Sequence, residues 1–147
     1  MCSSDLLFLR PFFTDMGKQN NFILWASSLM AIAVCFGALG AHALKKVLTA
    51  DSLAAWETGV RYQLIHGLAI LIIASGNHLF ESKRIALVLK LFIAGIILFS
   101  GSIYLLSTQS LSGLSVSWLG PMTPIGGLLM ISGWIMLFLQ KIGRAHV

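Results

Sequence analysis

The stretch IALVLKLFIAGIILFSGSIYLL, residues 85–106, decides the fold of this chain, because it is almost wholly apolar and carries a single charge at Lys90. A helix of about 20 residues crosses the hydrocarbon layer of a bilayer, which is about 30 Å thick. Three further blocks of this kind occupy residues 22–44, 56–79 and 121–140, and short polar breaks separate them. The sequence therefore predicts an all-α protein built as a bundle of four transmembrane helices.

Composition supports one membrane domain and excludes a second, water-soluble one. Hydrophobic residues make up 57% of the chain and charged residues only 10%, whereas a soluble domain has about 25% charged residues. The net charge of +5 does not indicate nucleic acid, because the basic residues are scattered at the ends of the apolar blocks. Basic residues in that position favour contact with phospholipid headgroups. We expect the partner to be the lipid bilayer, with no nucleic acid.

Both ends of the chain look foreign to this domain. The opening MCSSDL and the closing IGRAHV are what the two adapters of a common sequencing method encode when they are translated. Such segments are excluded from fold reasoning, as expression tags are. We expect residues 1–15 to be a non-native or upstream extension, residues 16–141 to be the membrane domain, and residues 142–147 to be an adapter-derived tail. Nothing would have selected the two end segments to pack.

The charges that flank the helices predict the orientation of the bundle. With four crossings, the two termini and the loop at residues 80–84 share one side of the membrane. The basic residues on that side are Lys18, Lys83, Arg84 and Lys141. The other side has Lys45 and Lys46, with Arg61 just beyond them. Positive charge accumulates on the cytoplasmic side, so we expect both termini to be cytoplasmic.

Polar residues gather in the half of the bundle that lies away from the predicted cytoplasmic side. Ionisable groups inside a membrane are costly and usually face a bundle interior or a cavity, which makes them functional candidates. The candidate polar cluster consists of His42, Glu57, Arg61, Tyr62, His66, Tyr104 and Thr123, and Gln63, Ser100 and Ser102 lie in the same half.

Glu57 and Arg61 are four residues apart, a spacing that brings a carboxylate and a guanidinium together on one helix face and predicts a partly buried ion pair. The alternative follows from Trp56, an aromatic residue of the type found at membrane interfaces. On that interpretation, the two charges lie among the headgroups and only anchor the helix.

No motif in the chain indicates a metal, a cofactor or catalysis. His42, His66 and Glu57 lack the short fixed spacing of a metal site such as HExxH or CxxC. Ser100 or Ser102 beside a histidine is the only combination that could provide a nucleophile and a base. We therefore expect that the protein is not an enzyme and that it has no catalytic, cofactor-binding or metal-binding residues.

Small residues predict where the helices approach each other closely. Ala33, Gly37 and Ala41 have this spacing in the first helix, and Gly126 and Gly133 are seven residues apart in the fourth. These residues indicate packing within the bundle, and dimerisation through one of the same faces stays open. The block GPMTPIGG, residues 120–127, is interpreted as a proline-initiated helix start, with an irregular segment lining a cavity as the alternative.

Four ordered motifs carry a family resemblance. They are GALGAHALKK at residues 37–46, WETGVRYQLIHGLAIL at 56–71, LFSGSIYLL at 98–106 and LGPMTPIGGLLMISGW at 119–134. Together they resemble the YgdD/YwdK-like family of small integral membrane proteins of unknown function. The resemblance covers about residues 16–141 and implies a four-helix, multi-pass protein of the bacterial inner membrane. It implies no established activity and no site residues.

Three classes of function remain open. A structural or interaction module, which we favour, predicts that the cluster of Glu57, Arg61 and His66 is fully self-paired; its partner would be lipid, another membrane protein or a second copy of the chain. A small permease or channel for protons, ions or a small solute predicts instead a hydrated cavity that reaches His66 between the first, second and fourth helices. An intramembrane enzyme needs the serine and histidine pair described above.

Overall fold

The computed structural model describes residues 3–76, 83–113 and 115–144, with side-chain surroundings for residues 20–76, 83–113 and 115–139. Its elements are α1 (Ser3–His42), η1 (Leu44–Lys46), α2 (Ala50–Ser75), α3 (Lys83–Ser107), α4 (Gln109–Ser112), η2 (Ser117–Leu119) and α5 (Met122–Arg144). Within these ranges there is no strand, and four spans of 23 to 27 residues are long and apolar enough to cross a membrane. The prediction of an all-α, four-helix membrane protein is confirmed.

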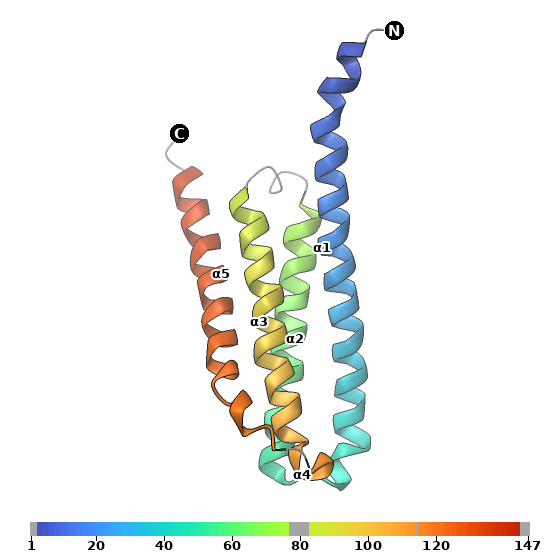
Figure 1. Ribbon diagram of the computed structural model, residues 1–147, viewed down its shortest axis with the longest axis vertical. Helices are drawn as coiled ribbons and strands as arrows, with labels where there is room; N and C mark the ends of the chain where they lie inside the picture. Colours follow the sequence, from blue (N-terminus) through green and yellow to red (C-terminus); the bar gives the residue numbers. More distant parts are fainter. Residues whose placement is uncertain (1–2, 77–82, 114, 145–147) are drawn as a thin grey trace.

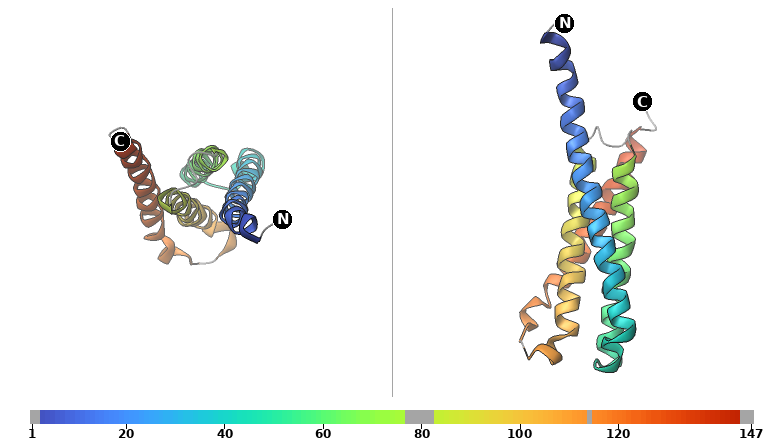
Figure 2. Two further views of the ribbon diagram at one scale, coloured as in Figure 1. Left: turned by 90° about the horizontal axis from the view of Figure 1, so that it is seen from above. Right: turned by 90° about the vertical axis from the view of Figure 1, so that its right-hand side faces the viewer.

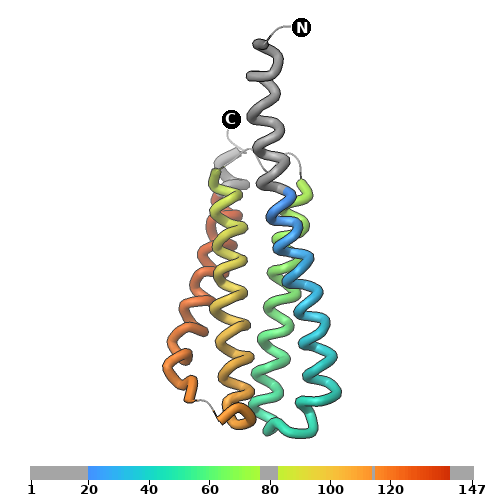
Figure 3. Tube along the Cα trace, turned by 45° about the vertical axis from the view of Figure 1, so that its right-hand side comes forward, coloured from blue at the N-terminus to red at the C-terminus, as the bar shows by residue number. Residues whose placement is uncertain are grey.

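The four long helices run antiparallel and follow one another in an open row. Helix α1 packs against α2, α2 against α3, and α3 against α5, so α1 and α5 stand at the two ends of the row (Figures 1 and 2). Helices α2 and α3 bury a larger share of their spans than α1 and α5 do. Figure 3 shows η1 and α4 at the same end of the bundle. We call this end, which also holds η2, the η1 end.

Three helices begin earlier than hydropathy predicts: α3 by two residues, at Lys83, and α1 and α2 by more. Helix α2 starts at Ala50 and not at residue 56, because the side chain of Thr49 caps it by accepting a hydrogen bond from the backbone N–H of Ser52, at 3.3 Å. Asp51 in the first turn adds a favourable charge at the positive end of the helix dipole. Helix α1 starts at Ser3 and not at residue 22. Backbone hydrogen bonding does not require apolar side chains, so hydropathy marks the membrane span and not the helix start.

Helix α5 begins at the proline block, as the first of the two interpretations predicts. Its first residue, Met122, directly follows Pro121, and Pro124 lies within the first turn. Backbone N–H groups in a first turn have no partner within the helix, so proline costs little there. The backbone N–H of Ile125 donates to the carbonyl of Pro121 at 3.4 Å. The block is therefore a regular helix start.

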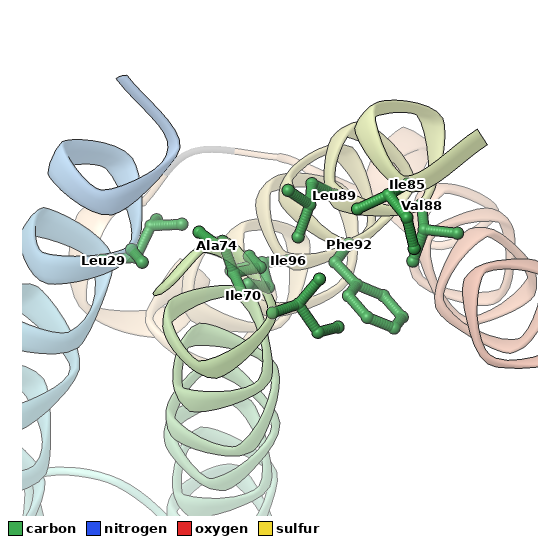
Figure 4. Close-up of a cluster of buried hydrophobic side chains, with 10 residues drawn as sticks. Leu29, Ile70, Ala74, Ile85, Val88, Leu89, Phe92 and Ile96 are labelled. Atoms are coloured by element: carbon green, nitrogen blue, oxygen red, sulfur yellow. The ribbon is translucent and has the colours of Figure 1, made fainter. Parts of the chain in front are cut away.

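The apolar core lies between α2 and α3 and extends to α1 (Figure 4). Phe92, Leu89 and Val88 of α3 and Ile70 of α2 are fully buried, and Leu29 of α1 packs against the same cluster. Lipid tails are as apolar as these side chains, so burial alone contributes little to association within a membrane. Close steric fit must supply the rest of the stabilisation.

That fit is closest between α3 and α5. A Cβ added to Gly126 would lie 2.9 Å from the Cα of Phe99, and a Cβ added to Gly133 would lie 2.6 Å from the ring of Phe92. A Cβ on Gly95 would lie 3.1 Å from the carbonyl oxygen of Gly126. These contacts confirm that Gly126 and Gly133 serve packing within the bundle. They also bring the backbones of α3 and α5 close enough for their hydroxyl side chains to meet.

Candidate functional site

Gln63 connects three helices near the middle of the bundle. Its side chain is 3% exposed. The amide nitrogen donates to the backbone carbonyl of Leu29 on α1 at 2.8 Å, and the amide oxygen accepts a hydrogen bond from the hydroxyl of Tyr104 on α3, also at 2.8 Å. A carbonyl oxygen has two lone pairs, so Leu29 can accept this bond beside a helical one. Gln63 is thus the hub of the α1, α2 and α3 interface.

Two more side chains donate to backbone carbonyls of a neighbouring helix. The indole N–H of Trp56 donates to the carbonyl of Phe36 on α1 at 2.9 Å, and the hydroxyl of Ser100 donates to the carbonyl of Gly59 on α2 at 2.9 Å. The rings of Phe36, Trp56 and Tyr104 pack together with centroids 4.6 to 5.3 Å apart. Aromatic packing and hydrogen bonding therefore stabilise the same junction.

His66 connects α2 to α5. Its ring is buried, and its Nε2 accepts a hydrogen bond from the indole N–H of Trp134 at 3.1 Å. The indole can only donate, so the proton of the neutral imidazole is on Nδ1, which lies 2.9 Å from the carbonyl oxygen of Tyr62 and donates to it. Both ring nitrogens are occupied, and the rings of Tyr62, Phe92 and Trp134 surround the imidazole.

Thr123 belongs to the junction of α3 and α5. Its hydroxyl is 2.7 Å from that of Ser102, which also donates to the carbonyl of Phe99 at 3.0 Å. This bond lies beside the close approach at Gly126. We call the set of side chains that hydrogen bond between helices the interhelical network; it consists of Trp56, Gln63, His66, Ser100, Ser102, Tyr104, Thr123 and Trp134.

Glu57 and Arg61 lie outside this network. Both side chains are exposed on the outer face of α2, where they line a groove of about 340 Å³ together with Gly37 of α1, Trp56, Val60 and Leu64. Among the described residues neither of the two has an ion-pair partner, so the predicted buried pair is not formed. The physical reason is their exposure, because an exposed pair gains only about 0 to 1 kcal/mol against the entropy of ordering two long side chains.

The seven candidate residues therefore do not form one cluster. The self-pairing of Glu57, Arg61 and His66 that a structural module predicts is wrong, because His66 bonds to Tyr62 and Trp134 while Glu57 and Arg61 are exposed. His66, Tyr104 and Thr123 belong to the interhelical network, and Tyr62 contributes its carbonyl and its ring. Glu57 and Arg61 line the groove, and His42 is exposed at the last residue of α1.

The candidate cluster lacks five residues of the interhelical network, namely Trp56, Gln63, Ser100, Ser102 and Trp134, and Gln63 is the most central of these. The signal that could have found it is an amide in mid-helix, whose hydrogen bonds must be made by the protein because lipid offers no partner.

No catalytic or metal-binding arrangement was found in the residues that the structure describes. In those ranges, no three histidine, cysteine, aspartate or glutamate side chains gather around a point where a metal ion could bind. The hydroxyls of Ser100 and Ser102 hydrogen bond to Gly59 and to Thr123 and Phe99, and not to a histidine. Cys35 is exposed.

Comparison with known proteins gives a family match over most of the bundle. The profile of a family described as "Protein of unknown function (DUF423)" matches residues 36–127, which include all seven candidate residues. Among the similar proteins is a UPF0382 membrane protein of Staphylococcus aureus (strain bovine RF122 / ET3-1), 43% identical over 120 residues, or 80% of this chain and 92% of that protein.

Two further relatives come from other bacteria. The UPF0382 membrane protein YwdK of Bacillus subtilis (strain 168) is 35% identical over 122 residues, or 82% of this chain and 95% of that protein. A UPF0382 membrane protein of Haemophilus influenzae is 34% identical over 119 residues, or 81% of this chain and 91% of that protein. No solved structure matches the chain.

Proposed function

Because this chain belongs to the UPF0382 family of membrane proteins, also described as DUF423 and of uncharacterised molecular function, we propose that it acts as a structural or interaction module and not as an enzyme. We place it in the bacterial inner membrane, consistent with its bacterial relatives and its four apolar spans. Its partner beyond lipid would be another membrane protein or a second copy of the chain.

The observation that carries this proposal is that four of the five buried polar side chains among the described residues, Gln63, His66, Ser100 and Ser102, hydrogen bond between helices; the fifth is Ser107. Gln63 and Trp56 tie α2 to α1, Gln63 and Ser100 tie α2 to α3, and His66 ties α2 to α5. A transport pathway needs polar groups that face water and exchange partners, whereas these groups are bonded to protein atoms. The groove beside Glu57 is lined by six residues, and His66 is not one of them.

A flux assay tests this proposal against transport. The full chain is reconstituted into liposomes that contain a pH-sensitive dye, and a proton or potassium gradient is applied. We expect the gradient to decay at the rate of protein-free liposomes, because no described pathway reaches His66. A decay that is faster than in protein-free liposomes, and that is abolished by His66→Phe, would establish a permease or channel and overturn the proposal.

The basic residues support an orientation with both termini in the cytoplasm. Helix α1 begins and α5 ends at the same end of the bundle (Figure 1). Lys83 and Arg84, at the start of α3, are exposed at this end, opposite the η1 end with Lys45 and Lys46. The lysine and arginine bias favours the cytoplasm for the termini.

A further inference from the structure

The groove beside Glu57 and Arg61 presents two opposite charges on a lipid-facing surface. It lies between α1 and α2 and has a volume of about 340 Å³, and its apolar lining comes from Gly37, Trp56, Val60 and Leu64. Both charged side chains are exposed, and neither has an ion-pair partner among the described residues. Charges on a membrane helix are costly unless something compensates them, so the groove calls for a ligand that carries both signs.

The position of the two residues puts their charged groups within reach of the headgroups. At 1.5 Å per residue, Glu57 and Arg61 lie roughly 10 and 16 Å along the axis from Ala50, the first residue of α2. Side chains on a helix lean toward its N-terminus, which for α2 is the η1 end. Lys45 and Asp51 are exposed there. The carboxylate and the guanidinium can therefore extend from the hydrocarbon toward the polar layer.

We propose that this groove binds the headgroup of phosphatidylethanolamine, a phospholipid that carries a phosphate and a primary ammonium joined by a two-carbon link. The fork of N–H donors on Arg61 matches phosphate oxygens. The carboxylate of Glu57 accepts hydrogen bonds from the ammonium, which has three donors. The proposal rests on the proposed function of the protein as an interaction module and names its partner.

The spacing of the site agrees with this ligand. Residues four apart on a helix have Cβ atoms about 5 to 6 Å apart, which suits the two charges of a single headgroup. Arg61 is one turn deeper than Glu57, and Leu64 lies almost one turn deeper again, beside the region of the acyl chains. Gly37 has no side chain and leaves the α1 wall of the groove open.

The same chemistry predicts which lipids bind less well. The headgroup of phosphatidylglycerol has the phosphate and two hydroxyls but no ammonium, so it can bind Arg61 but offers Glu57 no positive charge. The ammonium of phosphatidylcholine is fully methylated and has no N–H to donate to Glu57. The groove should therefore prefer phosphatidylethanolamine to both.

Native mass spectrometry of the full chain in detergent, titrated with the three lipids at equal acyl-chain length, tests the inference. We expect phosphatidylethanolamine to bind tighter than either other lipid by on the order of tenfold, the effect of one charge-assisted hydrogen bond. Glu57→Gln should weaken phosphatidylethanolamine binding and abolish its preference over phosphatidylglycerol. It should not weaken phosphatidylglycerol binding, because it removes a negative charge beside an anionic headgroup. Arg61→Gln should weaken the binding of both lipids.

The matched control is Lys45→Gln, which removes an exposed positive charge at the same end of the bundle and should leave the lipid preference intact. If Arg61→Gln is not recovered folded, Arg61→Lys replaces it and should weaken phosphatidylethanolamine binding while keeping the lipid order. Equal binding of the three lipids would overturn the inference. So would an equal loss of phosphatidylethanolamine binding in Lys45→Gln and in whichever Arg61 variant is used. The flux assay does not depend on lipid preference, so failure of this inference leaves the proposed function standing, and the two failures are distinguishable.

Discussion

At the scale of single residues, the charge of a polar side chain in this protein determines whether it is buried or exposed. Uncharged Gln63 and neutral His66 are buried and bonded across helix interfaces, whereas charged Glu57 and Arg61 are exposed. One or two hydrogen bonds suffice for an amide or an imidazole, but a charge in a low dielectric also needs an opposite charge nearby. The uncharged groups can therefore form hydrogen bonds between helices, whereas the two charged side chains lie on the outer surface of the bundle.

The first prediction concerns Gln63, the hub of the network. Gln63→Leu removes the bonds to Leu29 and Tyr104 and leaves the Tyr104 hydroxyl buried without its partner. Interhelical hydrogen bonds in membranes contribute about 0.6 kcal/mol on average and up to about 1.7 kcal/mol. We therefore expect a loss of about 1 to 3 kcal/mol in the free energy of unfolding, measured by denaturing-detergent titration.

A double-mutant cycle with Tyr104→Phe tests whether the two side chains are coupled. The double variant has no orphaned hydroxyl, so it should be more stable than the sum of the two single losses implies. Ser132→Ala is the control, because the hydroxyl of Ser132 is exposed and donates only to Leu128 of its own helix. Strictly additive losses would show that the Gln63 and Tyr104 bond contributes nothing to stability.

At the scale of elements, α3 is the central helix, since it packs against α2 on one side and α5 on the other. The two interfaces are built differently. Large apolar side chains fill the contact with α2, such as Ile70 against Phe92 and Ile96. Glycines bring the backbones together at the contact with α5. Close backbone approach is the usual means of helix association in lipid, so the second interface should be sensitive to a single added methyl group.

Gly126→Ala tests this sensitivity. The added Cβ would lie 2.9 Å from the Cα of Phe99, so α3 and α5 would have to separate, and the Ser102 and Thr123 bond would weaken. Overpacking of this kind typically costs about 1 to 3 kcal/mol, and we expect a loss of that size in the same titration.

Gly101→Ala on α3 is the matched control, because no atom lies within 4 Å of its added Cβ. The change from glycine to alanine inside a helix stabilises by up to about 1 kcal/mol, so the control should be neutral or slightly stabilised. If both variants lose the same stability, the close approach of α3 and α5 does not determine the stability of the bundle.

At the scale of the whole molecule, the four antiparallel spans place both ends of the membrane domain on one side of the bilayer. From the bias of lysine and arginine we propose that this side is the cytoplasm, with Lys45 and Lys46 as the opposing charges. The row also leaves α1 and α5 lined with exposed apolar side chains, as expected for helices that face lipid.

The orientation predicts the behaviour of reporter fusions. A fluorescent protein fused after Lys141 should be fluorescent, and a phosphatase that works only outside the cytoplasm should be inactive at the same position. The same phosphatase inserted between Val47 and Leu48, at the η1 end, should be active. A phosphatase active after Lys141 and inactive at the η1 end would reverse the orientation.

The sequence by itself determined the number of membrane helices, the approximate extent of their spans and the family. Hydropathy is a local property that is compared with a known bilayer thickness, so residues 85–106 are recognisable without any knowledge of their neighbours. The sequence also indicated the half of the bundle in which polar residues gather, and the packing role of Gly126 and Gly133.

Only the tertiary structure decided how those residues are used. Four nearly uniform apolar helices carry little information about which faces meet, and a hydrogen bond to a backbone carbonyl, such as that from Gln63 to Leu29, leaves no trace in the sequence of its acceptor. Which candidate residues join the interhelical network and which line the exposed groove depends on which helix faces pack against each other. Glu57 and Arg61 have the spacing of an ion pair, yet their exposure on the outside of α2 is a consequence of where α1 and α3 pack.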